Sequence, residues 1–281
     1  MPREAMNNTT QQSYKEEVMQ YTKKDAIHAL LFAAYVVLIA LVGNTLMIIF
    51  DLTDDDGRMT FAGYLMNVGS VFLHLVPLFV ILKKKGQGFR SLGLHVIGWK
   101  KALFAGLFFV ILFLMLFQGL LPGLLAGWQM RSPIMIVSVI IYLLIMAVRE
   151  DILYVGYIQT RIYGLIKKDF LAIGTVGSLF AVVHFPGFIT FNILSGEGFG
   201  VNFWLMFVGM TLSWIIGHVL FNTLFRQFRS IIVVTLFHFS SNLAIRGDLW
   251  EYSGEHGVFY LISGGAAIGA FLLITVFLKV R

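Results

Sequence analysis

Long apolar runs separated by short polar segments dominate the chain. Most of these runs are long enough to cross a hydrocarbon core of about 30 Å as helices. The runs cover residues 25–50, 60–82, 101–122, 133–160, 170–190, 202–224, 230–246 and 258–279. The apolar–polar alternation that is typical of a membrane β-barrel is absent. The pattern therefore predicts an all-α, polytopic integral membrane protein with about eight transmembrane helices.

The polar segments between the runs are too short to form a soluble domain. Residues 1–24 are polar and lack the apolar core that precedes the cleavage site of a signal peptide. We therefore expect residues 1–24 to be a polar cytoplasmic segment and residues 25–281 to form a single eight-helix membrane domain.

Positive charge alternates along the chain and predicts the topology. Most of the 21 Lys and Arg residues lie in the odd-numbered segments outside the runs, and Arg161 is assigned to one of them. Because cytoplasmic loops collect Lys and Arg, both termini are expected to be cytoplasmic. The net charge of +6 comes from these flanking residues, so we expect contacts with membrane lipids and none with nucleic acid.

The composition narrows the possible chemistry. Apolar residues make up 58% of the chain and charged residues only 13%, which excludes an ordinary soluble protein. Without cysteine there is no disulfide, no thiolate nucleophile and no Cys-ligated zinc. Several tryptophans flank the predicted spans, where interfacial aromatic residues are typical. These tryptophans are Trp128, Trp204, Trp214 and Trp250.

Two adjacent acidic residues, Glu150 and Asp151, lie inside the fourth predicted span. A charge near the bilayer centre costs about 2.5 kcal/mol or more, so such a residue normally faces a polar cavity and a partner. The pair is therefore a candidate functional site, and an ion pair that only packs helices together is the alternative. Gly156, just after the pair, would let another helix or a substrate backbone come close.

Histidines inside the spans are candidate partners for the acidic pair. Phe180 and His184 lie four residues apart, as do His238 and Asn242, so each pair shares one helix face. At 1.5 Å per residue, Glu150, His184, His238 and Asn242 lie roughly 13–22 Å from the predicted cytoplasmic ends of their helices. The same spacing recurs at His218 and Asn222, so spacing alone does not identify the site. We interpret His74 and His218 as packing residues.

The acidic pair, the Phe180–His184 pair and the His238–Asn242 pair form three motifs along the chain. In this order they resemble those of the CAAX-protease and bacteriocin-processing family of intramembrane glutamate proteases, which includes type II CAAX prenyl endopeptidases. The family has E-E-x-x-x-R, then F-x-x-x-H, then H-x-x-x-N. The chain has Glu150-Asp151, then Phe180 to His184, then His238 to Asn242, all within residues 133–246. The resemblance selects His238 over His218, because a short polar turn and an apolar entry precede the family's last motif, as in RSIIVVTLFHFSSN.

The resemblance implies an endopeptidase that hydrolyses prenylated CAAX-type or other membrane-associated peptides. Glu150 and His184 would activate a water molecule, and His238 and Asn242 would donate hydrogen bonds to the oxyanion. Asp151 and Phe180 would support them. No cofactor and no metal ion are implied. We expect a prokaryotic cell membrane as the location, or the endoplasmic reticulum membrane of a eukaryotic host, and the sequence does not indicate an oligomeric state.

Two departures from the family leave alternatives open, and the first is that the second acidic residue is Asp151 instead of glutamate. Val155 occupies the position of the family arginine and cannot pair with a carboxylate. This favours, as the main alternative, a non-proteolytic member that acts as an immunity factor, scaffold or regulator. Two histidines and two carboxylates would also suit a zinc protease, although the chain lacks H-E-x-x-H, and a transporter relay is a third possibility.

Overall fold

The computed structural model describes residues 14–52, 60–94, 99–113, 128–130, 132–194, 198–246 and 250–252. The chain divides into two compact units. Unit 1 contains residues 1–96 and 149–231, and unit 2 contains residues 97–148 and 232–281. The expectation of a single membrane domain over residues 25–281 stays a prediction.

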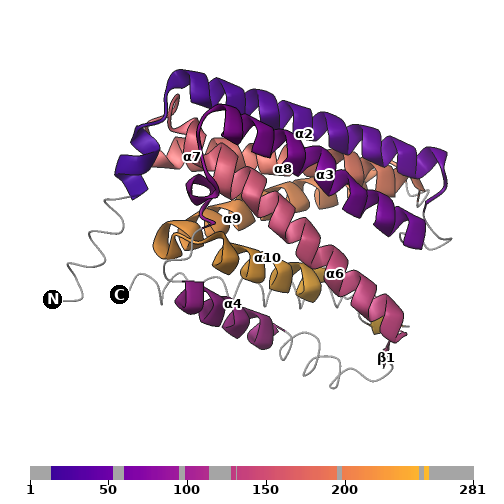
Figure 1. Cartoon of the computed structure of the whole chain (residues 1–281). Helices are drawn as coiled ribbons and strands as arrows, with labels where there is room; N and C mark the ends of the chain where they lie inside the picture. Colours follow the sequence, from indigo (N-terminus) through magenta and orange to yellow (C-terminus); the bar gives the residue numbers. More distant parts are fainter. Residues whose placement is uncertain are drawn as a thin grey trace. The chain divides into compact units, whose positions relative to one another are not determined.

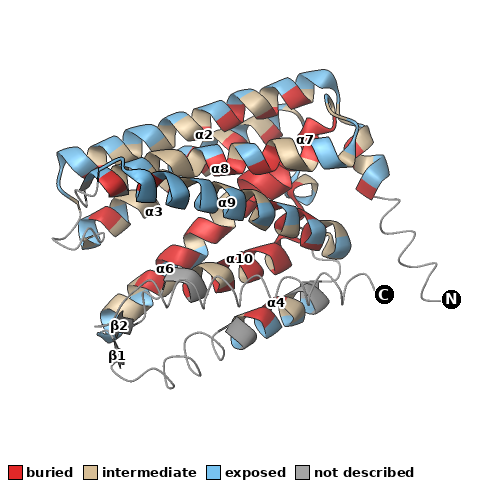
Figure 2. Ribbon diagram, turned by 180° about the vertical axis from the view of Figure 1, so that it is seen from behind, coloured by how far each residue is buried: buried red, intermediate tan, exposed pale blue. Residues whose placement is uncertain are grey.

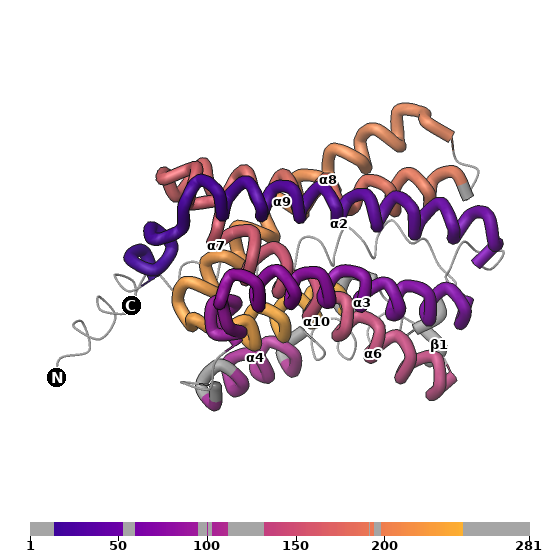
Figure 3. Tube along the Cα trace, turned by 45° about the horizontal axis from the view of Figure 1, so that its top comes forward, coloured from indigo at the N-terminus to yellow at the C-terminus, as the bar shows by residue number. Residues whose placement is uncertain are grey.

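Unit 1 is built around four long helices (Figure 1). They are α2 (Lys23–Ile49), α3 (Phe61–Lys84), α8 (Asp169–Leu194) and α9 (Val201–Phe228). Helix α8 packs against α2 and α9, and α2 also contacts α3 (Figures 1 and 3). Three short elements complete the unit: the 3-10 helix η1 (Phe89–Leu92), the π-helix η3 (Asp151–Ile158) and α7 (Gln159–Ile162).

Unit 2 contains α4 (Trp99–Phe113), most of α6 (Pro133–Glu150) and nearly all of α10 (Ile231–Arg246). The rings of Phe109 and Phe237 meet edge to face at 5.1 Å and join α4 to α10. The strands β1 (Trp128–Met130) and β2 (Trp250–Tyr252) form a short antiparallel ribbon in which Gln129 pairs with Glu251. This ribbon is the one non-helical element that the described residues add to the predicted all-α fold.

Five described helices are long and apolar enough to cross a membrane, and they correspond to the first, second, fourth, fifth and sixth predicted spans. They are Lys23–Ile49, Phe61–Lys84, Pro133–Ile162, Asp169–Thr190 and Val201–Phe228. The seventh run forms a shorter apolar helix, and the eighth lies outside the described residues. The third run is described as far as Phe113. A helical integral membrane protein is thus supported, while the count of eight spans and the orientation of the termini stay predictions.

Buried residues of the helices face the rest of the protein, and their exposed apolar residues are expected to face lipid. In Figure 2 buried residues gather around α7, whereas α2 and α9 carry mostly exposed and intermediate residues. Large apolar side chains such as Leu31 and Phe72 are exposed. In water such a surface would favour association, but lipid chains cover it at no cost in a membrane.

The first span begins at a defined polar cap. The hydroxyl of Thr22 accepts a hydrogen bond from the backbone N–H of Asp25, and the Asp25 carboxylate accepts one from the backbone N–H of Thr22 at 3.0 Å. This capping box satisfies donors that the first helical turn leaves without partners. It fixes the start of α2 close to the predicted position.

Candidate active site

The acidic pair lies where α6 ends and a π-helix begins. Glu150 is the last residue of α6, and Asp151 is the first of the eight residues in η3. Asp151 is buried at 1% exposure, and the other residues of η3 are buried as well. A π-helix closes i→i+5 hydrogen bonds and is rare, and it is often found at functional sites. The regular helix expected over residues 133–160 therefore changes its hydrogen-bond register at the acidic pair.

The two carboxylate oxygens of Glu150 have different neighbours. Arg149 donates a hydrogen bond from Nη2 to Oε1 at 2.7 Å. The second oxygen, Oε2, lies 3.7 Å from Nε2 of His184. The structure thus brings together Glu150 and His184, as the sequence predicted, and adds Arg149 to them.

The hydrogen bond at Nδ1 of His184, the ring nitrogen that does not face Glu150, determines the tautomer of the ring. Nδ1 lies 2.6 Å from the backbone carbonyl oxygen of Phe180. Because a carbonyl oxygen can only accept, we assign the proton to Nδ1. In the neutral ring Nε2 is then an acceptor, and it faces Glu150.

Aromatic rings enclose the imidazole of His184. The Phe180 ring meets it edge to face at 4.7 Å, and the Trp214 indole of α9 stacks on it at 4.7 Å with an interplanar angle of 20°. Phe180 also contacts the Tyr154 ring of η3 at 5.2 Å. The F-x-x-x-H motif therefore places both residues on one helix face, as its spacing predicted.

The second pair of predicted site residues belongs to unit 2. His238 and Asn242 lie on α10, whose helical backbone includes both, so the four-residue spacing puts them on one face. His238 is buried at 4% exposure. Glu150 and His184 belong to unit 1, so the roles of His238 and Asn242 rest on the motif.

The other histidines inside the spans have packing contacts. Nε2 of His218 lies 3.0 Å from Oε1 of Gln159, and the His218 ring lies 5.8 Å from the Phe180 ring. Nδ1 of His74 lies 2.7 Å from the backbone carbonyl oxygen of Ser70. Both histidines are buried. These contacts support their interpretation as packing residues.

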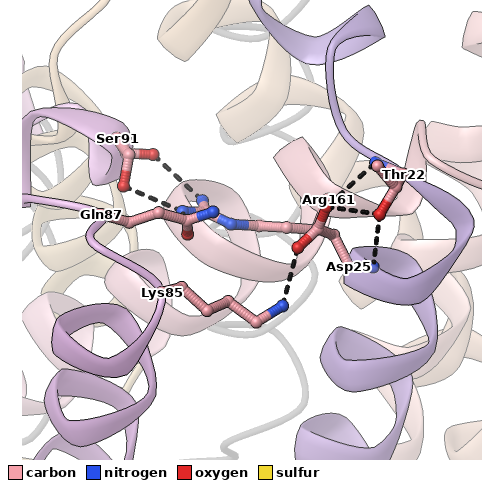
Figure 4. A network of polar contacts seen from close by, with 6 residues as sticks. All are labelled: Thr22, Asp25, Lys85, Gln87, Ser91 and Arg161. Carbon is pink, nitrogen blue, oxygen red and sulfur yellow. Dashed lines mark hydrogen bonds and ion pairs between the residues drawn. The ribbon is translucent and has the colours of Figure 1, made fainter.

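The sequence did not reveal the surroundings of Arg161. It was expected in a cytoplasmic loop, but its side chain is only 1% exposed, and Figure 4 shows it extending to the turn around η1. Nη2 donates to Oε1 of Gln87 at 2.8 Å and to Oγ of Ser91 at 2.9 Å. Nη1 donates to the carbonyl oxygen of Gly156 at 3.0 Å. Among the described residues, every hydrogen-bond acceptor of this guanidinium is neutral.

Two further features fix Arg161 and the end of η3. The guanidinium carbon lies 4.7 Å and 4.6 Å from the ring centres of Tyr21 and Tyr157. A Cβ atom on Gly156 would lie 2.8 Å from the carbonyl oxygen of Leu92. The close approach expected at Gly156 is therefore made by the chain's own turn at η1.

A separate ionic cluster ties the N-terminal segment to the end of α9. Arg229 donates to Glu17 and lies over the Tyr14 ring, and Arg226 donates to Asp169 at 3.0 Å. Burial raises the pKa of Tyr14 to about 12, although the two arginines counteract part of this shift. Tyr14 is therefore neutral near pH 7, and this cluster stabilises the fold away from the candidate site.

Among the described residues, no three histidine or acidic side chains lie close enough together to hold a metal ion. Metal independence was expected from the family resemblance, and it stays a prediction that a chelator tests directly.

Comparison with known proteins gives one match. The family model of type II CAAX prenyl endopeptidase Rce1-like proteins matches residues 131–244. No curated protein and no solved structure matches the chain. The matched segment contains the acidic pair, Phe180, His184, His238 and Asn242. The match confirms the resemblance drawn from these motifs, and through residues 131–244 the chain is similar to the Rce1-like family of type II CAAX prenyl endopeptidases.

Proposed function

We propose that the chain is an intramembrane glutamate endopeptidase. It would cleave a peptide bond near the C-terminus of a prenylated CAAX-type or other membrane-associated peptide. The Rce1-like match supports a protease at the family level, and the five apolar helices support a site within the membrane. The reaction would use a water molecule and no metal ion.

The distance of 3.7 Å between Oε2 of Glu150 and Nε2 of His184 carries this proposal. Both atoms are hydrogen-bond acceptors when Glu150 is ionised and His184 carries its proton on Nδ1. A water molecule that donates one hydrogen to each atom would keep its lone pairs free to attack a peptide carbonyl. As the water oxygen bonds to the carbonyl carbon, one proton would pass to Oε2 of Glu150, which would give it to the amide nitrogen as the C–N bond breaks. Nε2 of His184 would accept the second proton of the water molecule as the carboxylate product forms.

Arg149 has a defined part in this scheme. Its hydrogen bond occupies Oε1 and leaves Oε2 to face the water molecule. It also fixes the carboxylate plane, because both ends of the carboxylate then have a partner.

The tetrahedral intermediate would be stabilised by His238 and Asn242. Their side chains would donate hydrogen bonds to the oxyanion, and each such donor contributes about 3 kcal/mol in other proteases. This assignment follows the family motif and the shared face of α10. Asp151 and Phe180 would support the site from η3 and α8.

Peptide cleavage by the purified protein tests the proposal. The panel includes a farnesylated CAAX peptide, the same peptide without the lipid, and unrelated membrane-associated peptides. We expect chelator-resistant cleavage that is lost in Glu150→Gln and His238→Ala and kept in Glu16→Gln, since Glu16 is exposed. Cleavage that a chelator abolishes would establish metal chemistry instead.

The buried Val155 favours one second candidate, a non-proteolytic protein with the same fold. Its side chain is 1% exposed and cannot pair with Asp151 or with a substrate carboxylate. A wild-type protein that cleaves no peptide of the panel, together with a Val155→Arg variant that does, would support this candidate.

A further inference from the structure

The stack between His184 and Trp214 joins two helices at the candidate site. The indole lies on α9, thirty positions along the chain from the imidazole on α8. The ring centres are 4.7 Å apart and the planes differ by 20°, so the indole covers one face of the imidazole. Most aromatic pairs in this structure instead meet edge to face or tilted, for example Phe185 with Phe207 at 47°.

Trp214 is itself held in place by α8. The rings of Phe185 and Phe188 each lie 6.5 Å from it, at interplanar angles of 48° and 83°. Contacts on several sides restrict the rotamers of the indole, and aromatic pairs at such distances are attractive. The indole is therefore a fixed surface against which the imidazole rests.

The contacts of His184 leave one nitrogen directed at Glu150. Nδ1 bonds the carbonyl of Phe180, the Phe180 ring blocks one side, and Trp214 covers a face. The imidazole can rotate only about its Cβ–Cγ bond; the hydrogen bond at Nδ1 restricts this rotation, and stacking against a flat indole restricts it further. Nε2 is then kept at 3.7 Å from Oε2 of Glu150.

An indole face also attracts the positive charge that the imidazole gains on taking a proton. Among the described residues, the charged and titratable groups around His184 come from two helices, α6 and α9. Glu150 and, behind it, Arg149 come from α6, and His218 of α9 lies across the Phe180 ring. The contact with Trp214 therefore acts on the same ring that Glu150 faces.

We propose that Trp214 is a positioning residue for His184, which fixes the plane of the imidazole and stabilises its protonated form during peptide hydrolysis. The catalytic part of this inference rests on the proposed protease function. The stacking of Trp214 on His184 is observed independently of that function.

Kinetics test the catalytic part. Trp214→Leu is expected to lower kcat roughly tenfold with KM changed less than about twofold, since the proposed action of the indole is on His184. Trp214→Phe keeps an aromatic face and should recover most of the rate. Trp204→Leu is the matched control, because Trp204 is an exposed residue of the same helix and should leave kcat unchanged. An unchanged kcat in Trp214→Leu would overturn the proposal.

Fluorescence tests the stack without any substrate. A protonated imidazole quenches the emission of an indole that it touches, so wild-type emission should depend on pH through His184. This dependence should disappear in Trp214→Phe and in His184→Gln and persist in Trp204→Phe. If it persists in Trp214→Phe, the proposal is wrong. If the wild-type protein cleaves no peptide, the protease function fails, and the emission result alone then supports or overturns the stack.

Discussion

The π-helix η3 has a polar centre at each of its ends, and the two centres differ in almost every respect. At its start, Glu150 is a partly accessible carboxylate, paired with Arg149 and 3.7 Å from His184. At its end, Arg161 is a fully enclosed cation whose terminal nitrogens all have close hydrogen-bond acceptors. The first centre is partly exposed, and the second is buried.

This difference distinguishes a candidate catalytic residue from a structural residue within one membrane span. An ionisable residue in a membrane helix is a candidate functional residue by default. Arg161 meets that description and yet binds only the chain's own groups, as far as the described residues show. What distinguishes Glu150 is access, because the side chains of His184 and Glu150 are 25% and 12% exposed, whereas Arg161 is buried. We therefore expect changes at Glu150 to alter rate and changes at Arg161 to alter stability.

The largest effect is expected at the start of η3. Glu150→Gln keeps the shape of the side chain but removes the general base, so kcat should fall by roughly a thousandfold. The thermal midpoint of the purified protein should change little, because the residue lies in a partly accessible site. Cleavage rates and thermal unfolding of the same preparation check both expectations. A variant that unfolds early would instead make Glu150 a structural residue.

The next largest effect is expected at the end of η3. Arg161→Met removes the guanidinium and the hydrogen bonds that it donates to neighbouring acceptors. This loss should lower the free energy of unfolding by about 2–4 kcal/mol. Arg161→Lys keeps the charge, but a single ammonium group cannot reach the acceptors of both terminal nitrogens. We therefore expect an intermediate loss of stability. Denaturation in detergent measures both variants. An equal loss of kcat in the folded fraction would show that the two centres are not separate.

The two centres also show which features the sequence could predict. The five described spans were predicted closely, because the length of an apolar run is a direct measure of a membrane helix. The proximity of Glu150 to His184 was expected from the resemblance and from similar depths in the membrane, and the structure brings the two residues together. Each of these predictions depends on hydropathy or on motif order, which the sequence records.

The features that the sequence did not predict depend on hydrogen-bond register and on contacts between helices. The shift to a π-helix at Asp151 leaves no mark in hydropathy. The sequence did not identify Arg149 as the partner of Glu150, because adjacent side chains on a regular α-helix do not face each other. Trp214 was grouped with interfacial aromatic residues, and only the packing of α8 on α9 shows it against His184.

A smaller effect on rate is expected at Arg149. Arg149→Met removes the hydrogen bond to Oε1 that helps to orient the carboxylate of Glu150, so kcat should fall about tenfold, as for loss of a charge-assisted hydrogen bond. Arg149→Lys should restore part of the rate by supplying a single donor. The control is Arg90→Met in the η1 turn, which should leave the rate unchanged because Arg90 is exposed. Full activity in Arg149→Met would remove Arg149 from the site.

The smallest effect is expected at Gln87, and it provides the sharpest test of independence between the centres. Gln87→Ala removes one acceptor from Nη2 of Arg161, while Ser91 keeps another, so the free energy of unfolding should fall by about 1 kcal/mol. Glu150 and Arg161 lie roughly 15 Å apart along the span at 1.5 Å per residue. Substitutions at such a distance are normally additive. The double variant Arg149→Met with Gln87→Ala should therefore show the rate of the first change and the stability of the second. A rate well below that of Arg149→Met would mean that the hydrogen bonds of Arg161 set the position of Glu150 through η3. The π-helix would then be part of the catalytic machinery.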